Sequence, residues 1–346
     1  MTTVDAKTEG RSAHEVLAWS RAAVEPALRA AVDALPSSMR RIAGYHFGWW
    51  NEHGQPEQVN GGKAIRPTLV LLSAEAVGGA AAAAVPAAAA VELVHNFSLL
   101  HDDVLDGDAT RRHRPTAWSV FGMNAAILAG DALLTLALDL LAASGHPAAT
   151  DAIRVLSAAV QDLLEGQSAD LAFERRVQVE LAECLRMAEQ KTAALMGCAC
   201  ALGALFGGGR PEQIHCLRGF GQHLGLAFQH VDDLLGIWGD PAVTGKPVYS
   251  DLRSRKKSLP VIAALISGTA AGLDLAELYH RDQPLPGSDV VHAAELIDIA
   301  GGRAWSQVQV DGLLAEAMRA LQAANPAARA AGELGALARL ATHRDQ

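Results

Sequence analysis

The stretch His95–Thr116, "HNFSLLHDDVLDGDATRRHRPT", decides how the rest of the chain is interpreted. An apolar run with helical spacing ends in four aspartates, and a pair of arginines follows. Asp102 and Asp106 stand one turn apart on the same helix face. At about 6 Å, two such charges repel by roughly 0.7 kcal/mol in water and about 3 kcal/mol at an effective dielectric constant of 20. A helix C-terminus also disfavours negative charge, so the pattern predicts that cations gather there.

A second stretch, 228–240, "FQHVDDLLGIWGD", repeats the arrangement with Asp232 and Asp233 at the end of an apolar helix. A solvated acidic helix end is the alternative interpretation of either stretch alone. Basic residues follow both clusters: Arg111, Arg112 and Arg114 after the first, and Lys246, Arg253, Arg255, Lys256 and Lys257 after the second. Carboxylates suit Mg²⁺, and arginine and lysine bind phosphate oxygens. Together the two stretches favour a magnesium-dependent diphosphate site.

Helical periodicity runs nearly from end to end, with Gly, Pro and Asn at the breaks and no alternating strand pattern. The sequence therefore predicts an all-α fold, a single-domain bundle of long helices around a deep central cavity. We expect a flexible N-terminal tail over 1–12 and one domain over 13–346. The expected helices cover about 12–34, 38–52, 63–77, 86–106, 116–143, 148–170, 178–206, 211–236, 257–267, 287–300, 302–323 and 326–342.

Composition excludes several function classes. The net charge of −9, without a basic stripe, argues against a nucleic-acid partner. The least polar stretch, 77–94, is mostly alanine and is interrupted by two glycines and a proline, so we expect no transmembrane segment. The first dozen residues lack a basic region followed by an apolar core, which predicts a tail rather than a signal peptide. We therefore expect a soluble, cytoplasmic protein.

Five segments in order carry a resemblance to a known family: "GGKAIRP", "HNFSLLHDDVLDGDATRR", "QKTAAL", "FQHVDDLLGIWGD" and "TGKPVYSDLRSRKKSLP". In order and spacing they resemble the signature segments of trans-isoprenyl (polyprenyl) diphosphate synthases, closest to short-chain geranylgeranyl-type members. The resemblance runs from about residue 20 to the C-terminus. It implies the isoprenoid synthase fold, transfer of a prenyl group between diphosphate substrates, three Mg²⁺ ions and a homodimer.

The resemblance also implies a role for particular residues. Asp102 and Asp106 would coordinate two Mg²⁺ ions and Asp232 a third, with Asp103 and Asp233 in support. The diphosphate of isopentenyl diphosphate would be held by Lys63, Arg66, His95 and Arg112. The allylic diphosphate would be held by Arg111, Lys191, Lys246 and Lys256, and Thr192 and Gln229 would line the reaction centre.

The chain departs from the family pattern at three positions. Gly236 stands where a complete DDxxD motif has a third aspartate, Ala64 where arginine is common, and His113 where glycine is usual. The family's chain-length determinants lie one helical turn before the first aspartates, at Phe97 and Ser98. A single bulky residue there implies a C20 product, while the alternative is that Phe97 is simply a core residue.

Three function classes follow. The first is condensation of isopentenyl diphosphate with dimethylallyl, geranyl or farnesyl diphosphate, giving geranylgeranyl diphosphate or another chain length. The second is a class I terpene cyclase, against which the second diphosphate clamp argues because a cyclase has no second diphosphate to hold. The third is a non-catalytic partner subunit, which would tolerate loss of the metal-binding aspartates.

Overall fold

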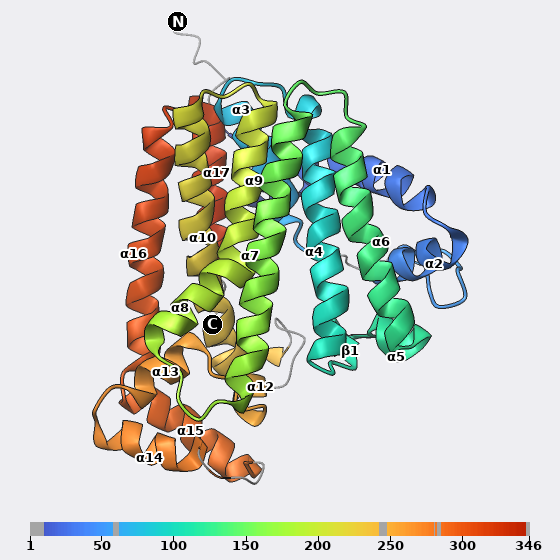
Figure 1. Cartoon of the computed structure of the whole chain (residues 1–346). Coiled ribbons are helices and arrows are strands. Elements are labelled where there is room, and N and C mark those ends of the chain that lie inside the picture. Colours follow the sequence, from blue (N-terminus) through green and yellow to red (C-terminus); the bar gives the residue numbers. More distant parts are fainter. Residues whose placement is uncertain (1–9, 58–61, 242–247, 280, 282–284, 344–346) are drawn as a thin grey trace, which may run out of the picture. The chain divides into compact units, whose positions relative to one another are not determined.

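The computed structural model describes residues 10–57, 62–241, 248–279, 281 and 285–343, and every structural statement below concerns these residues. They form two compact units, which are described separately. Unit 1 comprises 1–160, 195–221 and 320–337, and unit 2 comprises 161–194, 222–319 and 338–346. Both are built from helices, as predicted, and the described strands are two residues long (Figure 1).

Unit 1 holds the N-terminal helices. Its elements are α1 (Ala13–Asp33), α2 (Ser37–His46), α3 (Ile65–Ala76), η1 (Ala81–Ala84), α4 (Val85–Leu105), β1 (Thr110–Arg111), β2 (Arg114–Pro115), α5 (Ala117–Phe121) and α6 (Met123–Ala142). Unit 2 holds α8 (Leu181–Ala188), η2 (Glu189–Ala193), α12 (Ser250–Arg253), α13 (Leu259–Leu265), α14 (Ala270–Tyr279) and α15 (Gly287–Ile299). Residues of both units occur in α7 (Ala149–Arg175), α9 (Ala194–Phe206), α10 (Pro211–Trp238), α16 (Gly302–Ala323) and α17 (Ala328–Thr342).

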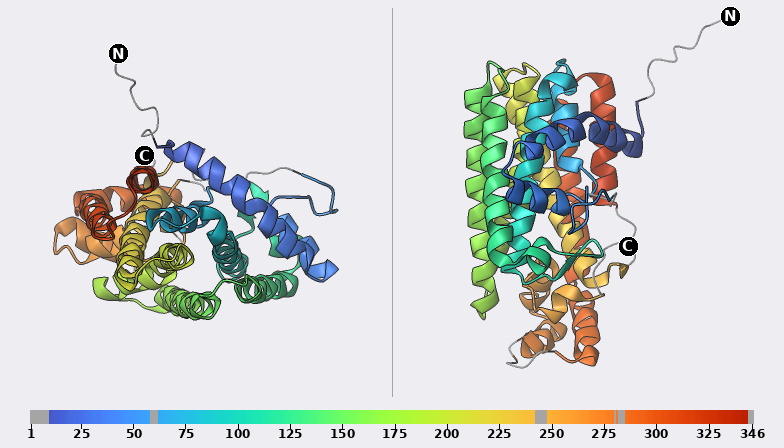
Figure 2. Two further views of the ribbon diagram at one scale, coloured as in Figure 1. Left: turned by 90° about the horizontal axis from the view of Figure 1, so that it is seen from above. Right: turned by 90° about the vertical axis from the view of Figure 1, so that its right-hand side faces the viewer.

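Helix α4 is the central element of unit 1. It packs against α1, α3 and α6, and α1 crosses it at a steep angle (Figure 2). Its residues 87–91 are completely buried, and four of these five are alanine, which lets neighbouring helices approach closely. Leu93 and Leu100 are also fully buried, and each such side chain contributes about 1.5–3 kcal/mol of apolar burial. The helix that bears the first aspartates is therefore rigidly held.

The core of unit 2 surrounds the second acidic helix end. Ile237 of α10 is buried against Leu252, Val261 and Leu275 from three later helices. A second apolar cluster joins Leu259 of α13 to residues of α7 and α8. These contacts fix the C-terminal end of α10 relative to α12 and α13.

Several element boundaries differ from the prediction. The expected helix 38–52 ends at His46, and Trp50 forms an isolated bridge with Pro56 instead. The expected helix 116–143 is broken at Gly122, whose φ is +90°. The short hairpin β1–β2 lies within an expected loop, and α14 falls where no helix was expected. Ser12 forms a capping box at the start of α1, because Ser12 N–H donates to Glu15 Oε2 (2.8 Å) and Glu15 N–H donates to Ser12 Oγ (3.3 Å).

Two described helices are long and apolar enough to cross a membrane by length and composition alone: Ala81–Leu105 and Met123–Ala142. The first is two-thirds buried inside the protein, and the second is one-third buried. The first also carries the aspartates of the predicted site, which suits a bundle helix. The absence of a transmembrane segment, the cytoplasmic location and the single domain stay predictions.

Candidate active site

The first aspartate cluster lies at the end of α4 in unit 1. Asp103 is 1% exposed, whereas Asp102 is half-buried and Asp106, the C-terminal cap, is exposed. Arg111 Nε donates to Asp103 Oδ1 at 2.6 Å, and the buried Oδ2 has no hydrogen-bond partner among the described residues. Burial raises the pKa of Asp103 to about 6 although Arg111 opposes the shift. Asp103 thus faces the protein, and Asp102 and Asp106 remain accessible.

The hairpin β1–β2 sets the place of the two predicted arginines. Its turn consists of Arg112 and His113, both in the left-handed region (φ 53° and 62°). Two-residue hairpin turns of this type require positive φ at both positions, and glycine or asparagine usually supplies it. Arg114 anchors the hairpin by donating to the carbonyls of Tyr45 (2.8 Å) and Trp50 (2.9 Å). The arginines are therefore held by a strained turn.

Replacing His113 by glycine should relieve part of this strain. A non-glycine residue in the left-handed region costs about 1 kcal/mol, so we expect His113→Gly to raise the melting temperature by roughly 1–3 °C. His113→Ala, which keeps the steric penalty, should give no increase. Thermal unfolding of both variants checks this expectation, and equal melting temperatures for them would contradict it.

Two residues of the predicted isopentenyl clamp, Arg66 and His95, lie on α3 and α4. Lys63 is exposed and precedes Ala64, the left-handed N-cap of α3 (φ 51°). Arg66 Nη1 lies 3.2 Å from His95 Nε2. Burial and the neighbouring Arg66 hold the pKa of His95 well below its usual value, so the ring is neutral. The structure therefore brings Arg66 and His95 together in unit 1.

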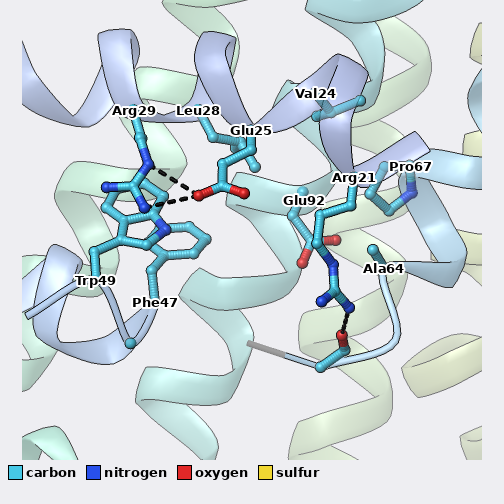
Figure 3. Close-up of a pocket in the computed structure, with 12 residues that line it drawn as sticks. Arg21, Val24, Glu25, Leu28, Arg29, Phe47, Trp49, Ala64, Pro67 and Glu92 are labelled. Atoms are coloured by element: carbon cyan, nitrogen blue, oxygen red, sulfur yellow. Dashed lines mark hydrogen bonds and ion pairs between the residues drawn. The ribbon is translucent and has the colours of Figure 1, made fainter. Parts of the chain in front are cut away.

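A cavity of about 140 Å³ is lined in part by Gly62 and Ala64, the chain neighbours of Lys63. Phe47 and Trp49 stack on one side of it, with ring centroids 4.6 Å apart. On the other side the Arg21 guanidinium donates to the carbonyl of Gly62 (Figure 3). Arg21 was not predicted as a site residue, and it ties α1 to the segment before Lys63.

The predicted chain-length residues are buried one turn before the aspartates. Phe97 is 3% exposed and meets the His101 ring edge-on at a centroid distance of 4.8 Å. Ser98 is 7% exposed, and its hydroxyl donates to the carbonyl of His95. Core packing accounts for both positions, so their effect on product length stays a prediction.

The second aspartate pair lies at the end of α10 in unit 2. Asp233 is 4% exposed and accepts hydrogen bonds from Leu259 N–H (2.9 Å) and Gln229 Nε2 (2.7 Å). Gln229 in turn accepts a hydrogen bond from Thr192 Oγ1 at 2.5 Å. Burial raises the pKa of Asp233 to about 6, although Lys256 lowers it. Asp232 is half-buried, so in both pairs the second aspartate is the buried member.

The raised pKa of Asp233 makes the stability depend on pH. The folded protein binds this proton more tightly than the unfolded chain, so the carboxyl favours folding below about pH 4, and this contribution is lost as the pH rises through about 6. Asp233→Asn removes the ionisation. The melting temperature of the variant minus that of the wild type should therefore increase from pH 4 to pH 8, measured without Mg²⁺. Asp274→Asn, at an exposed site on α14, is the control and should keep a constant difference.

Lys191 lies in a single π-helical turn, η2, between α8 and α9. Such turns are rare and are frequent at functional sites. Lys191 Nζ donates to Asp170 Oδ2 at 2.6 Å, and Asp170, on α7, was not predicted as a site residue. A Cβ on Gly166, one turn before Asp170, would lie 2.4 Å from Lys191 N, so only glycine allows this approach. Lys256 is half-buried, and Lys246 lies outside the described residues.

Asp251 of α12 occupies the space beside Gly236. A Cβ built on Gly236 would lie 2.2 Å from Asp251 Oδ2. The charge of Asp251 also contributes to the raised pKa of Asp233. A carboxylate from a different element therefore occupies the space beside Gly236, where the third aspartate of the motif would begin.

Gly236→Asp completes the DDxxD motif, yet it should impair the protein. The new side chain would collide with Asp251, and two like charges in contact disfavour each other. The atoms in the way are the carboxylate end of Asp251, which can rotate aside, so the loss comes mainly from the two adjacent like charges; we expect a lower melting temperature and no gain of activity. Gly236→Asp combined with Asp251→Gly should recover the stability. A single variant as stable as the wild type would contradict this interpretation.

The available side chains suit a hard cation that is held partly by the protein and partly by the phosphates of its substrate. No group of three His, Cys, Asp or Glu side chains within the described parts of the chain is close enough to hold a metal alone. Carboxylates are the side chains that Mg²⁺ prefers, and Mg²⁺ usually takes only one or two of them together with substrate phosphates. The accessible Asp102 and Asp106 of unit 1 therefore suit Mg²⁺ that arrives with a diphosphate, and so, separately, does Asp232 of unit 2.

Comparison with known proteins agrees with this chemistry. Residues 50–297 match the family model of polyprenyl synthetases. The chain is 49% identical over 297 residues to a (2E,6E)-farnesyl diphosphate synthase of Mycobacterium tuberculosis, covering 85% of this chain and 83% of that protein. It is 47% identical over 331 residues to a geranylgeranyl diphosphate synthase of the same organism, covering 95% and 93%.

A solved structure gives the same result. The chain superposes on a polyprenyl synthetase from Streptomyces coelicolor A3(2) with a TM-score of 0.91 and 46% identity, over 94% of this chain and 98% of that one. The chain belongs to the polyprenyl synthetase family, whose members are Mg²⁺-dependent trans-prenyltransferases of isoprenoid biosynthesis. The predicted family, fold and reaction class are confirmed, and the relatives support a short-chain enzyme.

Proposed function

We propose that the protein condenses isopentenyl diphosphate with an allylic diphosphate to give geranylgeranyl diphosphate. The observation that carries the condensation is the basic site of unit 1. Arg66 and His95 lie 3.2 Å apart there, and Lys63 lies just before α3, the helix that bears Arg66. A cyclase binds one diphosphate and needs no such second clamp. A non-catalytic subunit would not need both accessible aspartate sets.

Each group has a definite task in this proposal. Asp102 and Asp106 would hold two Mg²⁺ ions and Asp232 a third, and the metal would supply positive charge that stabilises the departing diphosphate. Arg111, Lys191, Lys246 and Lys256 bind the allylic diphosphate, while Lys63, Arg66, His95 and Arg112 bind that of isopentenyl diphosphate. Asp103 and Asp233 hold the neighbouring groups through their buried hydrogen bonds.

Lys191 can bind a phosphate without breaking its contact with Asp170. An ammonium group has three donors, and the Asp170 ion pair uses one of them. The same ion pair holds the pKa of Asp170 below its usual value against the effect of burial. Asp170 therefore orients Lys191 in the absence of substrate.

The product length rests on Phe97. One bulky side chain before the aspartates, beside the small Ser98, favours a C20 product, while the relatives include both C15 and C20 synthases. The test is incubation with Mg²⁺, isopentenyl diphosphate and dimethylallyl, geranyl or farnesyl diphosphate in turn. A dominant C20 alcohol after dephosphorylation supports the proposal. A dominant C15 alcohol, or one longer than C20, would contradict the proposed product length. Hydrocarbons formed from an allylic diphosphate alone would indicate a cyclase.

We also propose a homodimer in the cytoplasm. The apolar Met123 and Leu128 on α6 are 52% and 55% exposed, and only a third of this helix is buried within the chain. An exposed apolar helix face suits contact with a second copy. Sedimentation of the purified protein tests the dimer, and a monomer at micromolar concentration would contradict it.

A further inference from the structure

His46, the last residue of α2, lies beside the predicted arginine cluster although no sequence pattern pointed to it. It lines a small cavity together with Asp103, Arg111 and Arg112. Its ring is half-buried and near His95, the predicted isopentenyl ligand. The cavity thus gathers groups from α2, α4 and the hairpin, all within unit 1.

Tyr45 fixes the position of His46 relative to the hairpin. The Tyr45 hydroxyl donates to the carbonyl of Pro115 (2.8 Å), and Arg114 donates to the carbonyl of Tyr45 at 2.8 Å. The Arg114 guanidinium also stacks 3.8 Å from the centre of the Tyr45 ring. Three contacts therefore join the end of α2 to the strands that carry the arginines.

The cavity has an excess of positive charge. Arg111 is paired with Asp103 and Arg114 with Glu57 (2.9 Å). Among the described residues no carboxylate forms an ion pair with Arg112; burial and Arg111 lower its pKa, while the more distant Glu92 and Asp103 act in the opposite direction. Such a cavity attracts an anion.

The surroundings of His46 disfavour a positive charge on its ring. Burial and the nearby Arg111 and Arg112 lower its pKa to about 3, so the free protein holds a neutral imidazole among cations. A hydrogen bond with Asn96 opposes this shift, and Asn96 itself is tied to Glu92 (3.1 Å). A phosphate would reverse the electrostatic balance, because an adjacent anion favours the protonated ring and its N–H donors.

We propose that His46 binds the diphosphate of isopentenyl diphosphate in the cavity shared with Arg112. This inference rests on the proposed function and adds a fifth residue to the clamp of Lys63, Arg66, His95 and Arg112. Arg112, which lines the cavity, and the nearby His95, which does not line it but interacts electrostatically with His46, favour this substrate, whereas Arg111 is neutralised by Asp103.

Steady-state kinetics and direct binding test the proposal with His46→Gln. A hydrogen bond to a charged group is worth about tenfold in affinity, so KM for isopentenyl diphosphate should rise about tenfold. KM for the allylic diphosphate and kcat should stay within about twofold. Calorimetric titration with isopentenyl diphosphate alone should show the same loss of affinity. His53→Gln, at an exposed residue of the following loop, is the matched control. It should change neither KM for isopentenyl diphosphate nor the affinity measured by calorimetry.

The outcomes separate this inference from the proposed function. If the wild-type protein binds no isopentenyl diphosphate, the proposed function fails. If the wild type binds it and His46→Gln binds equally well, only the role of His46 fails. Equal increases in both KM values, together with a lower melting temperature, would show a structural role for His46 and overturn the inference. His46→Asn, a smaller amide, should weaken binding of isopentenyl diphosphate at least as much.

Discussion

Asp102→Asn should lower kcat/KM for condensation by about a hundredfold to a thousandfold, the range found when a charge-stabilising group is removed from a reaction centre. The accessible carboxylate at the end of α4 is a proposed Mg²⁺ ligand, and an amide binds this ion much more weakly. The measurement is the initial rate of condensation as a function of Mg²⁺ concentration. The variant should also need more Mg²⁺ for half-maximal activity.

Asp108→Asn is the matched control for this prediction. Asp108 lies on the same segment, two residues after Asp106, and is half-buried like Asp102. It is not a proposed ligand, so its substitution should change kcat/KM less than about tenfold. Equal losses in the two variants would mean that general negative charge at this helix end, rather than ligation by Asp102, supports the reaction.

Gly166→Ala should lower the melting temperature by about 1–4 °C and reduce activity as well. The new methyl group would lie 2.4 Å from Lys191 N and 2.8 Å from Lys191 Cα, which are backbone atoms that cannot rotate away. Overpacking of this kind costs about 1–3 kcal/mol, and a protein of this size loses roughly 1.4 °C per kcal/mol. Because the displaced residue is Lys191, KM for the allylic diphosphate should rise.

Gly219→Ala provides the comparison on another long helix. A Cβ at Gly219 would meet only the Cβ of Ala320, at an ordinary 3.8 Å. Alanine is the better helix former by about 1 kcal/mol, so this variant should melt at the same temperature or higher. A Gly166→Ala protein that is as stable as Gly219→Ala would show that α7 and η2 can separate without penalty.

The sequence predicted the helical architecture because apolar periodicity is a property of each segment alone. It also predicted the two aspartate pairs, since adjacent carboxylates at the end of an apolar helix are visible in the chain itself. The partners of these groups were harder to predict. Asp170 meets Lys191 across 21 positions, and Leu259 N–H meets Asp233 across 26, so only the folded chain shows them.

The departures from the family pattern show the same limit. Ala64 and His113 were noted because of their side chains, but their shared property is a backbone φ of 51° and 62°. No periodicity reveals a left-handed residue that is not glycine. His46 and Arg21 were missed for a similar reason, since a single basic residue on an ordinary helix carries no pattern.

The space shared by Gly236 and Asp251 has a consequence for how this family should be surveyed. Because a carboxylate at position 236 would meet that of Asp251 unless the latter moved, the identity of one position influences the other. We expect relatives with an acidic residue at the position of Gly236 to carry a small or displaced residue at that of Asp251, and relatives with glycine to retain the acid. Counting carboxylates within one motif would then misjudge which homologues keep an acidic side chain at this place. Scoring the two positions as a pair would avoid that error.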